Sequence, residues 1–373
     1  MFERRSFIYR FILGPSFAEC ELTRLFVTLT AFPEVLLSPY LACSGRFLSL
    51  LDTSTAPPNH SIETDYTNST KAVKELRKRG SSDGPYQEGD LQLTVILGLG
   101  IVTFDLLDSG LHAHRICRYT LGLLDNHHAF SPELEDGLLP LIFMDTCNCL
   151  VRRQIPVYRS RTQKQGHVDR YIGLCVPLLS HMYELCCISS ELSDGLGAID
   201  EAIGEALSTV QEAIATWNPV IDEEANVALT SQESCIVVEQ ASIYRTVLLL
   251  VIHRLRHPVG TQDELAAEMA EIILHTVQGL YKNDQKRGVD RYTEAAFEYR
   301  MTLPFLVAGI ELQDPLRRTQ AMQILELVCW KKMYSTIANS LRDFLLFVWA
   351  TRDAGWNGHW FDLAAHGPSF VLL

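Results

Sequence analysis

Apolar residues return every three or four positions through most of the chain from residue 91 onward, and this spacing restricts the chain to helices. The clearest stripe lies between Gly197 and Trp217 and consists of Ile199, Ile203, Leu207, Val210, Ile214 and Trp217. Such intervals place the side chains on one face of a helix. The pair Asn218-Pro219 ends this helix, because a residue before proline avoids the helical region.

Two further helices follow in the sequence. The stretch "ASIYRTVLLLVIHRL", residues 241–255, is apolar on nearly all sides, which is typical of a helix at the centre of a bundle. In "TQDE", Thr261 is expected to cap the next helix and Glu264 to complete a capping box. The inward face of that helix is predicted to hold Leu265, Met269, Ile272, Val277 and Leu280. Since neither an alternating strand pattern nor a fixed-period repeat occurs, the sequence predicts an all-α fold, an irregular multi-helix domain with no sheet of note.

Composition divides the chain near residue 60. Residues 1–60 are expected to form a poorly defined N-terminal segment, and residues 61–373 a helical domain. From Asp52 to Asp90 the sequence is rich in Ser, Thr, Pro and Gly, which predicts a linker around one short helix at 71–78.

The N-terminus lacks the features of a secretory signal, because Arg10 breaks its apolar run too early. No apolar run approaches the roughly 18 to 20 residues that cross a bilayer, so no membrane span is expected.

The charge of the chain argues against direct contact with nucleic acid. With 373 residues, 47% of them hydrophobic, the chain can bury a large core. Its formal net charge is −13 and its pI is near 5.4, so the average surface repels phosphates. DNA binding by this chain alone is therefore disfavoured.

The cysteines do not follow a metal-binding pattern. They are Cys20, Cys43, Cys117, Cys147, Cys149, Cys175, Cys186, Cys187, Cys235 and Cys329. No C-x2-C pair occurs and no pair of histidines supplies the remaining ligands of a zinc site. Most of these cysteines lie in apolar helical sequence, so we expect free, reduced and buried thiols. No metal and no cofactor are expected.

Four short stretches resemble catalytic or binding motifs, and each has a plainer interpretation. "GLGIVTF", with Gly98 and Gly100, lacks the third glycine of a dinucleotide site and favours close helix packing. "DNHHAF", with His127 and His128, is typical of a polar turn between helices. "DEEAN" at 222–226 and "NDQKRGVD" at 283–290 do not form a D-D-x-x-D pair of metal-binding carboxylates, so loop acids are expected. The sequence nominates no catalytic residue.

The stretch "RMTLPFLVAGIELQDPLRR", residues 300–318, has an unusual composition for a packed segment. Pro304 is tolerated in the first turn of a helix, and Ala308 and Gly309 allow a neighbouring helix to approach closely. The charged residues that follow are spaced to pair across turns or to bridge to another helix, and they are Glu311, Asp314, Arg317 and Arg318. The sequence therefore favours packing and charge pairing over catalysis here.

The same stretch carries a resemblance to a known family. Together with "ASIYRTVLLLVIHRLRHPVG" and "LRDFLLFVWATRDAGWNGHWFDLAAHG", it resembles the C-terminal half of the fungal-specific transcription factor regulatory domain. The central signature of that domain is matched by Leu303, Pro304, Phe305, Leu306, Ala308, Gly309 and Glu311, with leucine where tryptophan is usual. The family's downstream arginine fits Arg317 or Arg318, and its closing tryptophan rhythm fits Trp349, Asp353, Trp356 and Trp360. The resemblance covers residues 65–373 and is strongest over the last 140.

One departure from the family bears on DNA recognition. Family members that bind DNA carry six cysteines near the N-terminus that share two zinc ions. This chain has only Cys20 and Cys43 before residue 100, so that zinc-cluster module is absent from it. Either the chain works through partners, or a first exon has been lost or misannotated.

The resemblance implies a non-enzymatic transcriptional regulator of a fungus, located in the nucleus and controlling a metabolic or secondary-metabolite pathway. It would act through its helical regulatory domain, residues 61–373, on protein partners such as a DNA-bound transcription factor or a co-regulator, and a homodimer is compatible with this role. The alternative is a helical enzyme or accessory protein of a biosynthetic pathway. The regulator and the enzyme hypotheses differ in whether the purified chain turns over a bound metabolite.

Overall fold

A computed structural model describes residues 12–51, 61–81, 88–124, 131–161, 165–194, 199–286, 300–329 and 334–372. The helices are α1 (Ala18–Ala31), α2 (Pro33–Leu51), α3 (Ile62–Gly80), α4 (Glu88–Asp108), α5 (Ala113–Leu124), α6 (Pro132–Arg152), α7 (Leu178–Asp194), α8 (Glu201–Thr216), α9 (Glu223–Ala228), α10 (Ser231–Arg256), α11 (Asp263–Lys286), α12 (Thr302–Ile310), α13 (Pro315–Val328), α14 (Ser335–Asp353) and α15 (Trp360–His366). In these ranges no strand forms, and one isolated bridge joins Asp169 to Gly173. The predicted all-α fold is confirmed.

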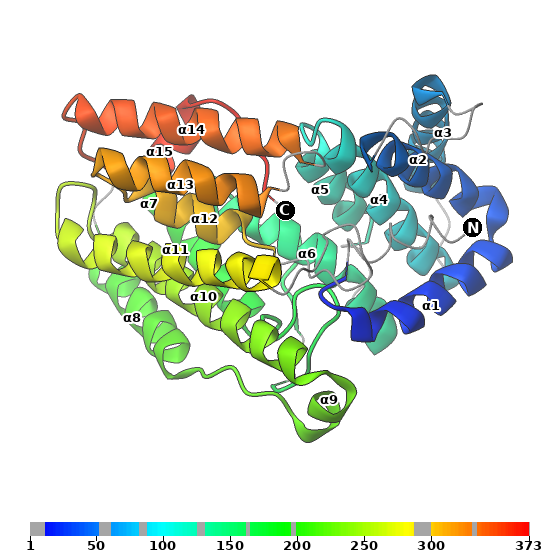
Figure 1. The fold of residues 1–373 in the computed structure, drawn as a ribbon, viewed down its shortest axis with the longest axis horizontal. Helices are drawn as coiled ribbons and strands as arrows, with labels where there is room; N and C mark the ends of the chain where they lie inside the picture. Colours follow the sequence, from blue (N-terminus) through cyan, green and yellow to red (C-terminus); the bar gives the residue numbers. More distant parts are fainter. Residues whose placement is uncertain are drawn as a thin grey trace.

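The helices are distributed along the long axis of the molecule (Figure 1). Helices α1 to α5 occupy one end, helices α10 to α14 occupy the other, and α6 lies between them. A single cluster of buried apolar side chains runs from Ile12 to Leu372 and joins both ends. A smaller cluster fills the space among α2, α3 and α4, where Leu36, Leu76 and Leu97 meet. The N-terminal helices are thus packed into the same fold as the rest.

Helix α10 lies at the centre of the C-terminal helices, as the sequence predicted. Its apolar side chains from Ile236 to Leu255 are buried on most sides. Thr230 and Glu233 form a capping box at its start, with the Thr230 side chain accepting from the Glu233 amide. Glu233 also accepts hydrogen bonds from the amide and the hydroxyl of Ser16, at 2.8 and 2.5 Å. The start of α10 therefore holds the N-terminal segment in place.

Two helices are long and apolar enough to cross a membrane by length and composition alone. They are α4, over Gly89–Asp108, and α10. Of their apolar windows, 67% and 61% are buried inside the fold. Such burial is typical of helices that form the core of a helical domain.

Helix α11 differs from its prediction at its start and in its buried face. It begins at Asp263, so Thr261 is not its cap, and the Asp263 carboxylate accepts from the Gly260 amide instead. Leu265 and Ile272 are 48% and 51% exposed. In the first half of the helix the buried residues lie one position later, at Ala266, Ala270 and Ile273, whereas Val277 and Leu280 are buried as predicted. Small alanines in the first half let α11 approach its neighbours more closely than leucines would.

Two other elements depart from their predicted extent. The helix predicted at 71–78 within the polar region is α3, which runs from Ile62 to Gly80 and buries Ala72 and Leu76. Ser61 caps it by accepting from the Glu63 amide, and basic residues fill its last turn. Helix α8 buries Leu207, Val210 and Ile214 of the predicted stripe, whereas Ile199 precedes the helix and is 36% exposed.

Candidate functional site

The segment with the unusual proline and glycine is α12, and all nine of its residues are buried. Pro304 lies in its first turn, where the missing N–H leaves no intrahelical acceptor unpaired. A Cβ atom on Gly309 would lie 3.2 Å from the side chain of Leu345 in α14. The indole nitrogen of Trp349, also in α14, donates to the Gly309 carbonyl at 2.9 Å. The segment is a packing element, as the sequence predicted.

Glu311, directly after α12, forms a buried ion pair with Arg254 of α10. The Arg254 Nε and Nη2 atoms donate to the two Glu311 carboxylate oxygens at 2.9 and 2.6 Å. Both side chains are at most 1% exposed. Nη2 of Arg254 also lies 2.9 Å from Asp263 Oδ1 at the start of α11. One guanidinium therefore connects three helical elements.

The remaining donors of Arg254 are used as well. Its Nη1 atom lies 3.2 to 3.4 Å from the carbonyl oxygens of His257, Pro258 and Thr261 in the loop between α10 and α11. Burial by itself lowers the pKa of Arg254, but the hydrogen bonds and charges of Glu311 and Asp263 outweigh it and leave that pKa raised. The buried charge is thus fully paired, the condition under which a protein tolerates one.

The other matched charges pair at the surface of the same helices. Arg318 in α13 binds Asp353 of α14 through two contacts of 2.6 and 2.8 Å, and its guanidinium lies 5.3 Å from the Trp349 ring. The hydrogen bond from Arg318 lowers the pKa of Asp353. Arg317 reaches Glu271 of α11 at 3.2 Å. Asp314 caps α13 by accepting from the Arg317 amide. These charges bridge helices or cap them, as the sequence predicted.

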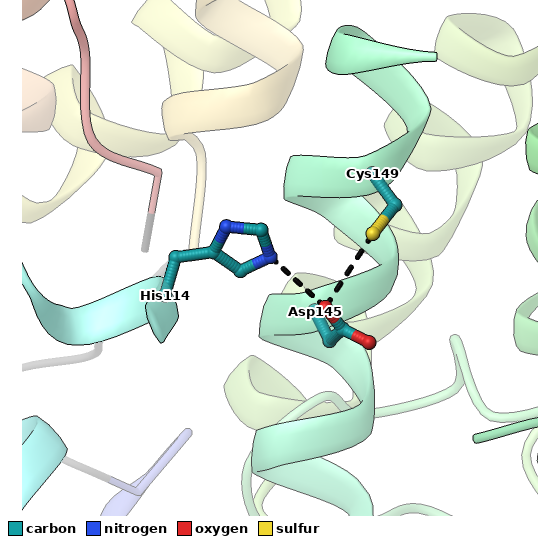
Figure 2. A group of neighbouring side chains, drawn as sticks. All are labelled: His114, Asp145 and Cys149. Carbon is teal, nitrogen blue, oxygen red and sulfur yellow. Dashed lines mark hydrogen bonds and ion pairs between the residues drawn. The ribbon is translucent and has the colours of Figure 1, made fainter. Parts of the chain in front are cut away.

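A second polar cluster lies between α5 and α6 and was not predicted. Figure 2 shows His114 of α5 pointing toward α6, which carries Asp145 and Cys149 one turn apart. The His114 Nε2 atom lies 2.9 Å from Asp145 Oδ1, and the Cys149 thiol lies 3.4 Å from the same oxygen. The Val157 amide donates to Asp145 Oδ2 at 2.7 Å. The histidine and the aspartate are 31 residues apart in the chain, so no local motif marks them.

Arg118 enters this cluster and supplies its positive charge. Its Nη1 atom lies 3.3 Å from Asp145 Oδ1 and 3.0 Å from the Cys149 sulfur. Burial alone raises the pKa of Asp145, but the hydrogen bonds from His114 and Val157 and the charge of Arg118 leave it lowered. Burial raises the pKa of the Cys149 thiol well above its usual range. The cluster is a charge-paired contact between helices with a protonated thiol.

The three ligand-type atoms of His114, Asp145 and Cys149 lie within 4.8 Å of one another, close enough to hold a metal ion. Two features oppose this. The Arg118 guanidinium is bonded to two of the three groups, and a metal would require the Cys149 thiol to lose its proton. A metal ion would have to displace the Arg118 guanidinium, and exchanging one cation for another gains little binding free energy. The arrangement therefore fits a structural contact better than a metal centre.

The comparison with family models gives one match, and it covers nearly the whole chain. Residues 10–373 match the model described as the fungal specific transcription factor domain. The chain belongs to this family. Comparison with curated proteins and with solved structures gave no match. The match begins at residue 10, whereas the sequence resemblance was traced from residue 65.

The family assignment agrees with the roles of the signature residues in this fungal transcription factor domain. Trp349 and Gly309 bond to each other, Arg318 pairs with Asp353, and Glu311 pairs with Arg254. Trp360 is 1% exposed and stacks on Phe361 with ring centroids 3.9 Å apart. The signature therefore describes contacts among α10, α12, α13 and α14, together with a buried tryptophan in α15. The family assignment supports a role in transcriptional regulation in general.

The other stretches singled out in the sequence have structural roles where they are described. A Cβ atom on Gly98 would lie 2.4 Å from the Thr120 side chain of α5, and one on Gly100 would lie 2.9 Å from Pro39 of α2, which confirms close helix packing. Asp222 caps α9 by accepting from the Ala225 amide, and Glu223 and Glu224, which were expected in a loop, lie in that helix instead. Residues 283–286, also expected in a loop, form the end of α11. His127, His128 and residues 287–290 lie outside the described residues.

The cysteines of the domain are free thiols in the structure. Seven are buried, Cys187 is partly buried, and Cys20 and Cys235 are exposed. Burial raises the pKa of Cys117, Cys147 and Cys186 well above the usual value. Such thiols pack as small apolar side chains.

We expect a zinc chelator to leave the melting temperature of the purified chain unchanged. Arg118 already provides the cation at the one three-residue cluster found among the described residues, so no metal-binding energy is linked to folding there. Thermal unfolding with and without chelator, and with added zinc as the matched condition, measures this. A drop of several degrees on chelation would show that a metal stabilises the fold.

Proposed function

We propose that this chain is a non-enzymatic transcriptional regulator that acts in a fungal nucleus through its helical domain. The observation that carries the proposal is the use of the family signature for helix contacts. The Glu311 carboxylate is hydrogen-bonded to Arg254, and the Trp349 indole nitrogen is hydrogen-bonded to the Gly309 carbonyl. These polar groups are therefore engaged inside the fold. A catalytic site would instead leave a nucleophile or base facing an open cavity.

The same proposal places a protein partner between this chain and DNA. The net charge of −13 repels phosphates over the range set by salt screening. Of the two cysteines before residue 100, Cys43 is buried and its thiol donates to the Gly100 carbonyl at 3.0 Å. It is therefore engaged in packing α2 against α4. A DNA-bound transcription factor or co-regulator would bring the chain to promoters.

We expect residues 1–373, purified alone, to show no sequence-specific binding to promoter DNA. The measurement is an anisotropy titration at about 0.15 M salt against the promoters next to the gene, with a zinc-cluster DNA-binding module as positive control. Promoter occupancy in cells, measured by chromatin precipitation, should nevertheless be detected. That combination supports recruitment through a partner.

Saturable binding that one base change weakens about tenfold, or about 1.4 kcal/mol, would overturn this proposal, since that is a usual cost of a mismatch in specific recognition. It would mean that the helical domain itself presents a DNA-reading surface. A purified chain that turns over a co-purified metabolite would instead place it among enzymes of a biosynthetic pathway.

A further inference from the structure

A cavity of about 150 Å³ lies among α1, α2, α4 and the segment that carries Tyr171. Its walls are mostly aliphatic, with Leu25 from α1, Leu36 and Pro39 from α2, and Leu99 from α4. An enclosed apolar cavity of about this volume accepts a benzene ring, and this pocket, which opens toward solvent, offers a space of similar size. The site can thus hold one ring-sized apolar group.

A second cavity of about 130 Å³ lies beside the first, on an adjacent face of α4 toward α6. It is lined by Pro140, Phe143 and Met144 of α6, among others. Leu99, Thr103 and Tyr171 line both cavities. Because the two chambers share these three side chains, they adjoin one another there.

Helix-interior prolines lie beside the open space. Each chamber is lined by a proline from a helix interior, Pro39 in α2 and Pro140 in α6. A proline there has no N–H to donate, and its ring presses on the preceding turn of its own helix. The first space lies beside the close contact of Pro39 with Gly100, and the second lies beside Pro140.

The charged groups at the first chamber are already paired with one another. The Tyr171 hydroxyl donates to Glu21 Oε1 at 2.8 Å, and Arg24 donates to the same oxygen at 2.7 Å. Burial raises the pKa of Tyr171 to about 12, so this hydroxyl stays protonated. A charged ligand would have to give up hydration without gaining a free counter-ion here.

Thr103 is the polar group that remains available where the chambers meet. On the same helix, the Thr94 hydroxyl donates to the Asp90 carbonyl at 2.7 Å. The Thr103 hydroxyl has no such bond to any described residue, although it lines both chambers. A ligand with a hydrogen-bonding group midway along its length would meet this hydroxyl.

We propose that these two chambers form a binding site for a small uncharged apolar molecule with two ring-sized portions and one hydrogen-bonding group between them, which meets Thr103. The site is separate from the signature helices and extends beyond the proposed regulatory function. Its ligand would bridge α1 and α2 to α4 and α6. Binding would therefore stabilise the packing of the N-terminal helices on the rest of the fold.

The probe for this site is N-phenyl-1-naphthylamine, whose two aromatic portions are joined by an N–H group and whose fluorescence rises in apolar surroundings. We expect saturable binding by the wild-type chain. Leu99→Trp, which fills the junction, should weaken it more than about tenfold. Thr103→Val keeps the shape but removes the hydroxyl, and should weaken binding about fivefold. Leu316→Trp, at an exposed position on α13, and Thr276→Val, at a partly buried position on α11 away from the chambers, are the matched controls and should bind as the wild type does.

Surface binding must be distinguished from binding in the chambers. Phe26 on α1 is 67% exposed and offers the dye an alternative apolar contact, so Phe26→Ser should leave the affinity unchanged. The proposal is overturned if the wild type shows no saturable binding, or if Phe26→Ser abolishes binding while Thr103→Val has no effect. Circular dichroism checks that each variant folds, and if Leu99→Trp does not, Thr103→Val decides the outcome.

Discussion

Replacing Glu311 with alanine is expected to lower the free energy of unfolding by about 3 to 5 kcal/mol. The reason is the buried guanidinium of Arg254, whose bidentate partner is Glu311 at 2.9 and 2.6 Å. Without that carboxylate, Asp263 is the only acid within 4 Å of Arg254 in the described part of the chain. The measurement is equilibrium unfolding in urea, followed by circular dichroism.

The matched control removes an acid of an exposed ion pair from the same group of helices. Glu271→Ala breaks the pair with Arg317, in which the two side chains are 42% and 52% exposed, and should cost about 0 to 1 kcal/mol. Glu311→Gln keeps the volume and removes only the charge. If Glu311→Ala and Glu271→Ala destabilise the protein equally, the buried pair does not carry the role assigned to it.

Replacing Trp349 with alanine is expected to cost about 3 to 5 kcal/mol, because it removes a large buried aromatic side chain and leaves a cavity. Trp349 is 4% exposed and its indole nitrogen donates to the Gly309 carbonyl. Trp349→Phe keeps part of the packing and removes the N–H donor, while the Gly309 carbonyl still accepts from the Leu312 amide at 3.3 Å. It should therefore cost less, about 1 to 3 kcal/mol, for the lost donor and the smaller ring.

Leu316→Ala serves as control for the tryptophan series, because Leu316 is 64% exposed and should change stability by no more than about 0.5 kcal/mol. Equal losses for Trp349→Phe and Trp349→Ala would assign the whole effect to the hydrogen bond. A negligible loss for Trp349→Ala would contradict the close packing of α14 on α12.

The predictions that succeeded rest on local periodicity and local stereochemistry. The continuous apolar run at 241–255 became the central helix α10, and Pro304 lies in the first turn of α12. Both follow from rules that act within a few residues. In the first half of α11 the buried face was predicted one position out of place, because hydrophobicity favoured Leu265 over Ala266, whereas Val277 and Leu280 were predicted correctly. The approach of a neighbouring helix, which selects the alanine, is a tertiary effect.

The partners of the charged residues were the part that sequence could not supply. The spacing of Glu311 allowed a bond across a turn or to another helix, and the partner is Arg254, 57 residues away. The contact of His114 with Asp145 likewise joins two helices and has no local pattern. Both cavities depend on how α2, α4 and α6 pack together. The sequence features associated with these cavities are the helix-interior prolines Pro39 and Pro140.

Transcript profiling of a deletion strain tests the regulatory function most directly. We expect a defined set of transcripts, belonging to a metabolic pathway, to change on deletion and to return with the wild-type gene. The unstable Glu311→Ala variant should restore it poorly, and Glu271→Ala should restore it fully. An unchanged transcript profile, together with accumulation of an unconverted metabolite in the deletion strain, would contradict a regulator and indicate an enzyme.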